Sequence, residues 1–447
     1  MVAVAEKRKM GIVSLTVFVA VNMMGSGIIL LPADMASLGG ISLLSWVVTT
    51  IGALLIAYSF SKAGKYCKKD GGMSAYAQSA HGKSAFFISS YAYYICLIIS
   101  AVAIAVTLIS YLAVFVHWLQ APIHQFIGVV IALIITTFIN FISPKATGRI
   151  SQFTIWGVII PVVASSLIGW FWFKPHLFAT AWNPHHITFG AGISSGIAIT
   201  LWAFLGIETA GAVSNSVKNP EKNVPIAVMA ATIFCAIFYL GSTAVAQGIV
   251  PNKILAASQA PLGLIFSYML GHTVGSIIAI LSVIACLGSL LAWQFTNAMV
   301  GKAAADDKLF PQIFGLSSDR GIPIIGMIIM LILELIIAAL SISKNSLETF
   351  NILLNMSVFL NLIPYIYSIS GTSSLLARRG SSRREYITTV ICSSGAVIYS
   401  LYAVYACGQS AVFWGAIIAL FGYLCYGYIA SRQIKNQIAK GELVEKY

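Results

Sequence analysis

Carboxylates inside long apolar segments are the side chains of this sequence best suited to chemistry. Of the thirteen Asp and Glu residues, only Glu208 and Glu334 lie deep inside such segments. A charged side chain in an apolar membrane interior is costly, so it is by default a candidate for function. Glu208 lies among small residues, including Gly206 and Thr209. We therefore predict that Glu208 faces a cavity, where it can accept a proton or bind an amine.

Glu334 has a different context. It lies in "LILELIIAAL", among large aliphatic residues and with no glycine nearby. This pattern does not indicate a cavity, and we expect Glu334 to face a neighbouring helix or a dimer partner.

Aromatic residues accompany Glu208. Trp202 precedes it by six positions, and Trp293 is central in "LGSLLAWQF". Indole faces bind ammonium and guanidinium groups by cation–π attraction, although most aromatic residues of membrane proteins pack or form interfacial belts. No Lys or Arg lies deep in an apolar segment, so a bound cation has to come from outside the chain. This favours amines as ligands, and a neutral, protonated Glu208 is the alternative.

Glycines interrupt two of the apolar segments. "NMMGSGIILLP" (Asn22–Pro32) contains Gly-Ser-Gly, and "AITLWAFLGIETAGAV" (Ala198–Val213) contains Gly206 beside Glu208. Each glycine weakens a helix by about 1 kcal/mol relative to alanine. Unwound backbone at membrane depth is tolerated where it lines a cavity, and exposed N–H groups near Ser26 and Gly27 would suit a carboxylate. Close helix packing is the other interpretation.

The composition identifies the class of protein. Of 447 residues, 59% are hydrophobic and 9% charged, and the mean hydropathy is +0.90. A soluble protein carries about 25% charged residues. Long uninterrupted apolar windows exclude a transmembrane barrel, and the chain has no Walker A sequence for nucleotide binding. We predict an all-α integral membrane protein that is not an enzyme.

Twelve windows are long and apolar enough to span a bilayer. Their approximate centres are Met24, Gly52, Ala101, Leu133, Ile160, Phe204, Ile237, Cys286, Leu333, Leu360, Val397 and Ile418. We read the first as a retained span rather than a signal peptide.

The basic residues predict the orientation. If both termini are cytoplasmic, only Lys174, Lys253 and Lys344 of the 26 Lys and Arg residues fall outside. This follows the positive-inside rule and supports an even number of spans. The basic residues are spread over all predicted cytoplasmic loops, which argues against nucleic acid as a partner.

Cysteines and histidines give no sign of a cofactor. Six of the seven cysteines fall in or at the ends of predicted spans, without metal-ligand spacing. The adjacent histidines of "NPHH" (Asn183–His186) are a weak metal signal. We predict no disulfide framework, metal or cofactor.

The two interruptions lie five spans apart. A first repeat over residues 11–175 (spans 1–5) and a second over 192–371 (spans 6–10) would each begin with a broken helix, and 386–431 would add two further spans. Paired glycine-interrupted segments of this kind indicate a transporter with inverted repeats and a binding site at the membrane midplane.

Several motifs together resemble the amino acid–polyamine–organocation superfamily. They are "NMMGSGIILLPADMASLGGIS", "LWAFLGIETA", "VKNPEKNVPIAV" (Val217–Val228) and "LGSLLAWQF". Within the superfamily the chain is similar to the basic amino acid/polyamine antiporters, which comprise putrescine–ornithine, cadaverine–lysine and arginine–agmatine exchangers. The segments around "IGWFWF" and "WNPHH" look most like the putrescine–ornithine branch.

The resemblance implies a twelve-span, five-plus-five inverted repeat, usually homodimeric, in the cell (inner) membrane. It implies exchange of ornithine, lysine or arginine for a related amino acid or for putrescine, cadaverine or agmatine. Glu208 would couple protonation or substrate charge to the conformational change. The substrate positions that it implies are Asn22, Ser26, Gly27, Tyr93, Trp202, Glu208, Trp293 and Ser357. Tyr365, Tyr423 and Tyr426 are further candidates.

Two positions depart from the family pattern. Gln78 replaces an acidic residue, and Ala101 replaces a polar asparagine. Loss of a carboxylate and an amide is expected to weaken recognition of a second ammonium group. The alternative functions are a proton-coupled amino acid symporter of the same fold and, from another class, an amino acid sensor that does not transport.

Overall fold

The computed structural model describes residues 9–67, 72–142, 144–212, 217–341 and 346–439. Helices account for 84% of the structure. Within the described ranges there is no named strand, and an isolated bridge joins Met10 to Val217. The prediction of an all-α protein is confirmed.

Nine helical segments in the described ranges are long and apolar enough to cross a membrane. An α-helix rises about 1.5 Å per residue, so about 20 residues span the hydrocarbon core. These segments are built from α3 (Leu43–Tyr66), α5 (Lys83–Leu112), α6 (Pro122–Ile142), α7 (Pro144–Thr154) with α8 (Trp156–Ile168), α12 (Pro220–Ile249), α15 (His272–Asp306), α17 (Ser346–Ser370) with α18 (Thr372–Arg378), α19 (Arg383–Ala406) and α20 (Gln409–Ala439).

Four shorter apolar helices complete the hydrophobic part of the described chain. They are α1 (Ile12–Met23), α10 (Phe189–Trp202), α14 (Pro261–Leu270) and α16 (Ile324–Leu340). Nine of the twelve predicted windows coincide with the long segments, and the other three centre on α16 or on the interrupted regions that follow α1 and α10. The full count of twelve spans stays a prediction.

The remaining elements are short. They are α2 (Leu31–Leu38), α4 (Gly72–His81), α9 (Pro175–Thr180), α11 (Thr209–Ala212), α13 (Asn252–Ala256), η1 (Ser26–Ile28), η2 (Gly40–Ser42), η3 (His117–Gln120), η4 (Gly169–Trp172) and η6 (Gln312–Phe314).

The first predicted interruption is present. Helix α1 ends at Met23, a single 3-10 turn follows, and α2 begins at Leu31. Such a break frees backbone carbonyls that water cannot reach, so the protein has to bind them. The buried Tyr111 of α5 does this, because its hydroxyl donates to the carbonyl of Ile29 at 3.0 Å. The same hydroxyl accepts from the backbone N–H of Leu262 at 3.1 Å, which connects the break to α14.

The second interruption lies between α10 and α11, over residues 203–208. Successive turns replace the helix here, and Gly206 has φ +115°, a conformation that side chains other than glycine rarely adopt. The buried Tyr239 of α12 donates its hydroxyl to the carbonyl of Ala203 at 3.0 Å. Both breaks are therefore stabilised in the same way, by a tyrosine from a neighbouring helix.

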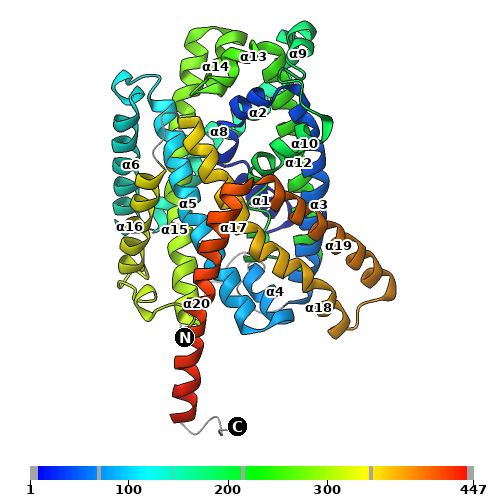
Figure 1. Ribbon diagram of the computed structural model, residues 1–447, viewed down its shortest axis with the longest axis vertical. Coiled ribbons are helices and arrows are strands. Elements are labelled where there is room, and N and C mark those ends of the chain that lie inside the picture. The colour runs from blue at the N-terminus through cyan, green and yellow to red at the C-terminus, as the bar shows by residue number, and fades with distance from the viewer. Residues whose placement is uncertain (1–8, 68–71, 143, 213–216, 342–345, 440–447) are drawn as a thin grey trace.

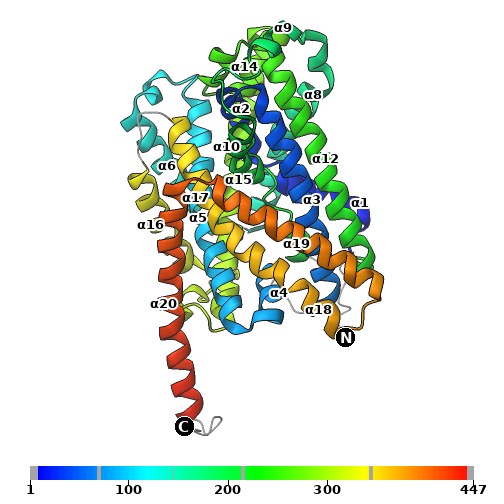
Figure 2. The same cartoon turned by 45° about the vertical axis from the view of Figure 1, so that its right-hand side comes forward.

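The second break contacts the last turn of α1 through its backbone, immediately before the first break. A methyl group on Gly206 would lie 2.9 Å from the backbone carbonyl of Asn22. Around them, α1 packs on α12, α10 packs on α3, and η1 contacts α5 and α15. In Figures 1 and 2, α5 and α17 cross the middle of the molecule, with α6 and α16 at one edge and α3, α12 and α19 towards the other. The interrupted helices thus meet in the interior.

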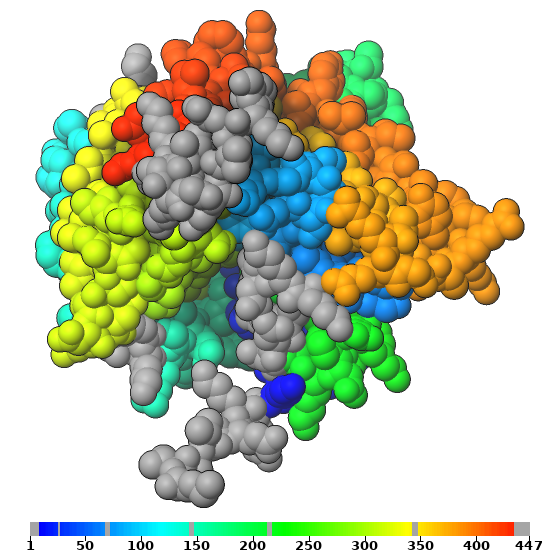
Figure 3. All heavy atoms as spheres, turned by 90° about the horizontal axis from the view of Figure 1, so that it is seen from below, coloured from blue at the N-terminus to red at the C-terminus, as the bar shows by residue number. Residues whose placement is uncertain are grey.

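One end of the molecule collects the segments that are rich in basic residues. Figure 3 views this end, where α4, α18 with the start of α19, the start of α12 and the end of α15 share a face. Here Glu385 accepts hydrogen bonds from Lys62 at 2.8 Å and Lys65 at 2.9 Å, which connects α19 to α3. We call this the basic end. That it faces the cytoplasm stays a prediction.

The opposite end carries the lysines that were predicted to lie outside. Lys174 precedes α9 and Lys253 lies in α13, and both helices lie at the top of Figure 1. Lys344 lies outside the described residues. Lys174 and Lys253 therefore lie at the end opposite to the basic end, and the orientation in the membrane stays a prediction.

Candidate functional site

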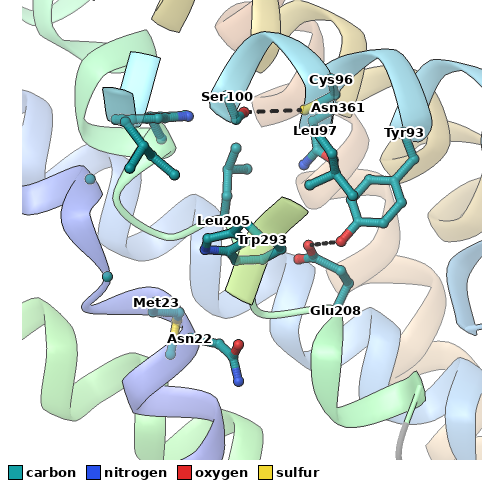
Figure 4. A pocket seen from close by; sticks show the side chains of 14 residues that line it. Asn22, Met23, Tyr93, Cys96, Leu97, Ser100, Leu205, Glu208, Trp293 and Asn361 are labelled. Atoms are coloured by element: carbon teal, nitrogen blue, oxygen red, sulfur yellow. Dashed lines mark hydrogen bonds between the residues drawn. The ribbon is translucent and has the colours of Figure 1, made fainter. Parts of the chain in front are cut away.

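A small cavity of about 50 Å³ lies between the two interrupted helices. Figure 4 shows Asn22 and Met23 on one side of it and Glu208 with Tyr93 on the other. The lining comprises Asn22, Met23, Gly25, Gly27, Tyr93, Cys96, Leu97, Ser100, Ile104, Trp202, Leu205, Glu208, Trp293 and Asn361. Six predicted site residues are therefore brought together, from α1, the two breaks, α5, α10 and α15.

Protein donors surround the Glu208 carboxylate. The Tyr93 hydroxyl donates to Oε1 at 3.1 Å, and the Tyr365 hydroxyl donates to Oε2 at 2.6 Å. The backbone N–H of Gly206 also donates to Oε2, at 3.0 Å. Glu208 is only 8% exposed, so these groups replace most of its hydration. Each carboxylate oxygen can accept more than one hydrogen bond, so these three donors satisfy much of the hydrogen-bonding capacity of the Glu208 carboxylate.

No basic residue balances this charge within the cavity. None of the 14 lining residues is Lys, Arg or His, and Glu208 contributes the only carboxylate among them. A buried carboxylate with hydrogen bonds but without a cationic partner attracts an external cation strongly, because the surrounding medium screens little. The cavity is thus suited to bind an ammonium group.

Two indoles lie against the Gly-Ser-Gly break. A methyl group on Gly27 would lie 3.5 Å from the Trp202 ring, and one on Gly25 would lie 4.0 Å from Nε1 of Trp293. These distances are in the range of van der Waals contact, so both rings pack closely on the unwound backbone. Trp202 is further held by an edge-to-face contact with Phe350, at 5.1 Å between ring centroids. Both aromatic faces can contribute cation–π attraction to a ligand in the cavity.

Residues on α5 and α17 complete the lining, and the sequence reasoning missed them. Cys96, Ser100 and Ile104 follow Tyr93 at helical spacing, so the same face of α5 carries them all. Asn361 lies one turn before Tyr365 on α17. Their helical spacing from Tyr93 and from Tyr365 is the sequence signal that could have identified them. The Asn361 amide and the Ser100 hydroxyl add polar groups to a wall that is otherwise apolar.

Other predicted residues lie outside the lining. Tyr365 does not line the cavity, although its hydroxyl donates a hydrogen bond to Glu208. Ser357 is buried and donates to the carbonyl of Leu354 at 2.9 Å. The hydroxyls of Tyr423 and Tyr367 are 2.6 Å apart, and Tyr426 packs on Phe87.

Three further positions named in the sequence analysis are Ser26, Gln78 and Ala101. The side chain of Ser26 lies outside the described residues, although its backbone belongs to η1. Gln78 on α4 and Ala101 on α5 do not line the cavity. A direct contact of either side chain with a ligand in this cavity would require another conformation of the protein.

Two other buried carboxylates are separate from the cavity. Glu334 is fully buried, and its Oε2 accepts a hydrogen bond from Nε2 of Gln294 at 2.8 Å. This contact connects α16 to α15, so Glu334 faces a neighbouring helix. Asp34 in the first turn of α2 is also fully buried and accepts from Asn351 at 2.8 Å. The sequence reasoning, which counted only Glu208 and Glu334, missed Asp34.

Removal of the Tyr365 hydroxyl tests the donor arrangement. Tyr365→Phe takes one hydrogen-bond donor from the buried Glu208, so we expect a lower free energy of unfolding than in the wild type. Loss of one partner from a buried hydrogen bond costs about 1–3 kcal/mol. The measurement is the thermal midpoint of the purified protein. Tyr367→Phe on the same helix is the control, because the Tyr367 hydroxyl contacts Tyr423. Identical midpoints for all three proteins would refute the role of Tyr365.

Comparison with known proteins identifies the family. The family model for amino acid permeases matches residues 10–429. The chain belongs to the amino acid permease family. The match covers both interrupted helices and the whole cavity, so the site lies within the region that defines amino acid permeases.

Individual relatives extend over nearly the full chain. The putrescine transporter PotE of Escherichia coli is 43% identical over 436 residues, which are 97% of this chain and 99% of the relative. PotE of Haemophilus influenzae is 42% identical over 426 residues, 95% and 98% of the two chains. The cadaverine/lysine antiporter of E. coli is 34% identical over 395 residues, 87% and 88%. With its apolar helices, this permease is a multi-pass membrane protein.

Proposed function

We propose that this permease is a secondary transporter that exchanges a basic amino acid for a related amino acid or for its decarboxylated amine. The candidate amino acids are ornithine, lysine and arginine, and the amines are putrescine, cadaverine and agmatine. The observation that carries the proposal is the Glu208 carboxylate, which has three protein donors and no cationic partner in its cavity. The names of the relatives, a putrescine transporter and a cadaverine/lysine antiporter, support it.

In the proposed complex, one ammonium group of the substrate binds Glu208 between Trp202 and Trp293. The carboxylate of an amino acid binds backbone N–H groups of the first break, near Ser26 and Gly27. An amine that lacks the carboxylate keeps the first contact and loses the second. Amino acid and amine then compete for one site, as exchange requires.

Transport requires this site to expand. A cavity of about 50 Å³ holds a few water molecules, whereas pockets for small organic ligands usually measure about 300 Å³ or more. Because the two breaks form opposite walls, we propose that they bend apart to admit substrate and close around it. Glu208 would couple substrate charge or protonation to this movement, since only a ligand with different affinity for the two states shifts their equilibrium.

We extend the proposal to the architecture. Twelve spans in two inverted five-span repeats, residues 11–175 and 192–371, would place the breaks at equivalent positions. The segregation of basic residues supports cytoplasmic termini in the inner membrane. A homodimer is proposed on the family resemblance alone.

Exchange is tested in proteoliposomes that contain the purified protein. We expect uptake of labelled ornithine into vesicles loaded with putrescine or ornithine, and little uptake into empty vesicles. Lysine with cadaverine and arginine with agmatine form the other arms of the panel. Equal uptake into empty vesicles under an imposed pH gradient would overturn exchange and support the symporter. Saturable binding without flux in any arm would support the sensor.

A further inference from the structure

A second, larger cavity extends towards the basic end of the molecule, on another face of α5 from the Glu208 site. Its volume is about 790 Å³, and its walls come from α5, the segment after α15, α16 and α20. In Figure 3 the red of α20 and the yellow-green of the segment near residue 310 lie at the same edge of the molecule. We call this cavity the α20 pocket.

The inner walls of the α20 pocket are apolar and aromatic. Phe87, Tyr91 and Ile95 form one stripe along α5, and Leu424 and Tyr428 belong to a facing stripe on α20. Each stripe covers about two helical turns, so the pocket extends about 12 Å along the helices. Phe310 packs edge to face on Tyr94, at 5.4 Å between centroids, and fixes the segment after α15 against α5. The walls therefore form a preformed apolar groove.

The charged residues of the pocket are all basic. Lys308 follows the last turn of α15, and Arg432 terminates the stripe on α20. Both side chains are exposed, and no Asp or Glu belongs to the lining. The groove is thus cationic at the end of the helices and apolar above it.

This polarity matches a lipid that lies parallel to the helices. A phospholipid places its phosphate at the membrane surface and its acyl chains in the interior, and basic groups between helices at that depth attract anionic headgroups. The adjoining surface of α20 is suited to contact lipid, since Leu424 and Tyr428 are each 73% exposed. We propose that the α20 pocket binds an anionic phospholipid, with its phosphate at Lys308 and Arg432 and an acyl chain against α5 and α20.

The bound lipid would act on the helix that carries part of the transport site. Tyr94 lines the α20 pocket, and its neighbour Tyr93 donates to Glu208 in the central cavity. The lipid would therefore support α5 from the side opposite to the substrate. This inference stands apart from the proposed function, because binding of lipid is measured without transport.

The test measures lipid that remains bound to the purified protein. Wild type is exchanged into micelles that contain equal amounts of phosphatidylglycerol and phosphatidylcholine, and bound lipid is quantified by native mass spectrometry. We expect phosphatidylglycerol to be retained preferentially. In Lys308→Gln/Arg432→Gln this preference should fall about tenfold or more, because two headgroup contacts are lost. The control is Lys174→Gln/Lys253→Gln, which removes two charges at the opposite end.

A second variant keeps the test independent of the charges. Ile429 also lines the apolar part of the pocket. Ile429→Trp fills this part, so it should lower retention of both lipids while Lys308 and Arg432 stay in place. An equal loss of preference in both double variants would overturn the proposal. Equal retention of phosphatidylcholine and phosphatidylglycerol by the wild type would also overturn the proposal. A change from dimer to monomer in Lys308→Gln/Arg432→Gln, with lipid retention unchanged, would assign the pocket to a second copy of the chain.

Discussion

Glu208→Gln is expected to abolish exchange of basic amino acids and amines. Glutamine preserves the size of the side chain but removes the charge, and its amide group would face donors from Tyr93, Tyr365 and Gly206. Loss of one partner from a buried, hydrogen-bonded charge pair costs about 2 kcal/mol or more, at least about 30-fold in affinity. The measurement is counterflow of labelled ornithine into vesicles loaded with putrescine.

Glu334→Gln is the matched control for this experiment. Glu334 is also a buried carboxylate in an apolar helix, but its contact is Gln294 rather than the cavity. A glutamine at this position keeps an oxygen that can accept from Gln294. We therefore expect folding and exchange within about twofold of wild type, since a bond between neutral groups contributes only about 1 kcal/mol. Equal loss in both variants, or normal exchange in Glu208→Gln, would contradict the role of Glu208.

Gly206→Ala is expected to disrupt the contact between the second break and the last turn of α1. The backbone of Gly206 has φ +115°, and the added methyl group would lie 2.9 Å from the carbonyl of Asn22. The conformation alone costs about 1–3 kcal/mol for a residue other than glycine. The overlap involves backbone on both sides, so a side chain cannot relieve it by rotation. We expect a lower thermal midpoint of the purified protein and loss of exchange.

Gly190→Ala provides the comparison. Gly190 lies in the first turn of α10, has no positive φ, and a methyl group there would have no neighbour within 4 Å. Alanine also favours the helix. This variant should match or exceed the wild type in thermal midpoint and keep its exchange activity. A Gly206→Ala protein as stable and active as Gly190→Ala would show that the breaks do not need this close approach.

The sequence predicted the parts of the site that are encoded locally. Glycines at positions 25 and 27 and at 206 indicated the two breaks, and the structure has both. Glu208 and Trp293 were identified because their types are unusual inside apolar segments, and both line the cavity. Such signals need no knowledge of which helices meet.

Contacts between residues far apart in the sequence could not be predicted from such local signals. Nothing near Tyr111 or Tyr239 indicates that their hydroxyls bind the carbonyls of Ile29 and Ala203. Tyr365 was a candidate, but its position behind Glu208 depends on how α17 packs on α5. Asp34 was missed because it lies at the end of the first apolar window and not deep inside it. The positions and contacts of these residues depend on how the helices pack against one another.

Equilibrium binding to the purified permease tests the central claim most directly. That claim is that the cavity between the breaks binds an ammonium group through the charge of Glu208. Labelled ornithine is titrated onto wild type, Glu208→Gln and Glu334→Gln in detergent, with unlabelled putrescine as competitor. We predict saturable binding that putrescine displaces in the wild type and in Glu334→Gln, and at least about 30-fold weaker binding in Glu208→Gln. Equal affinity of all three proteins for ornithine would contradict the account.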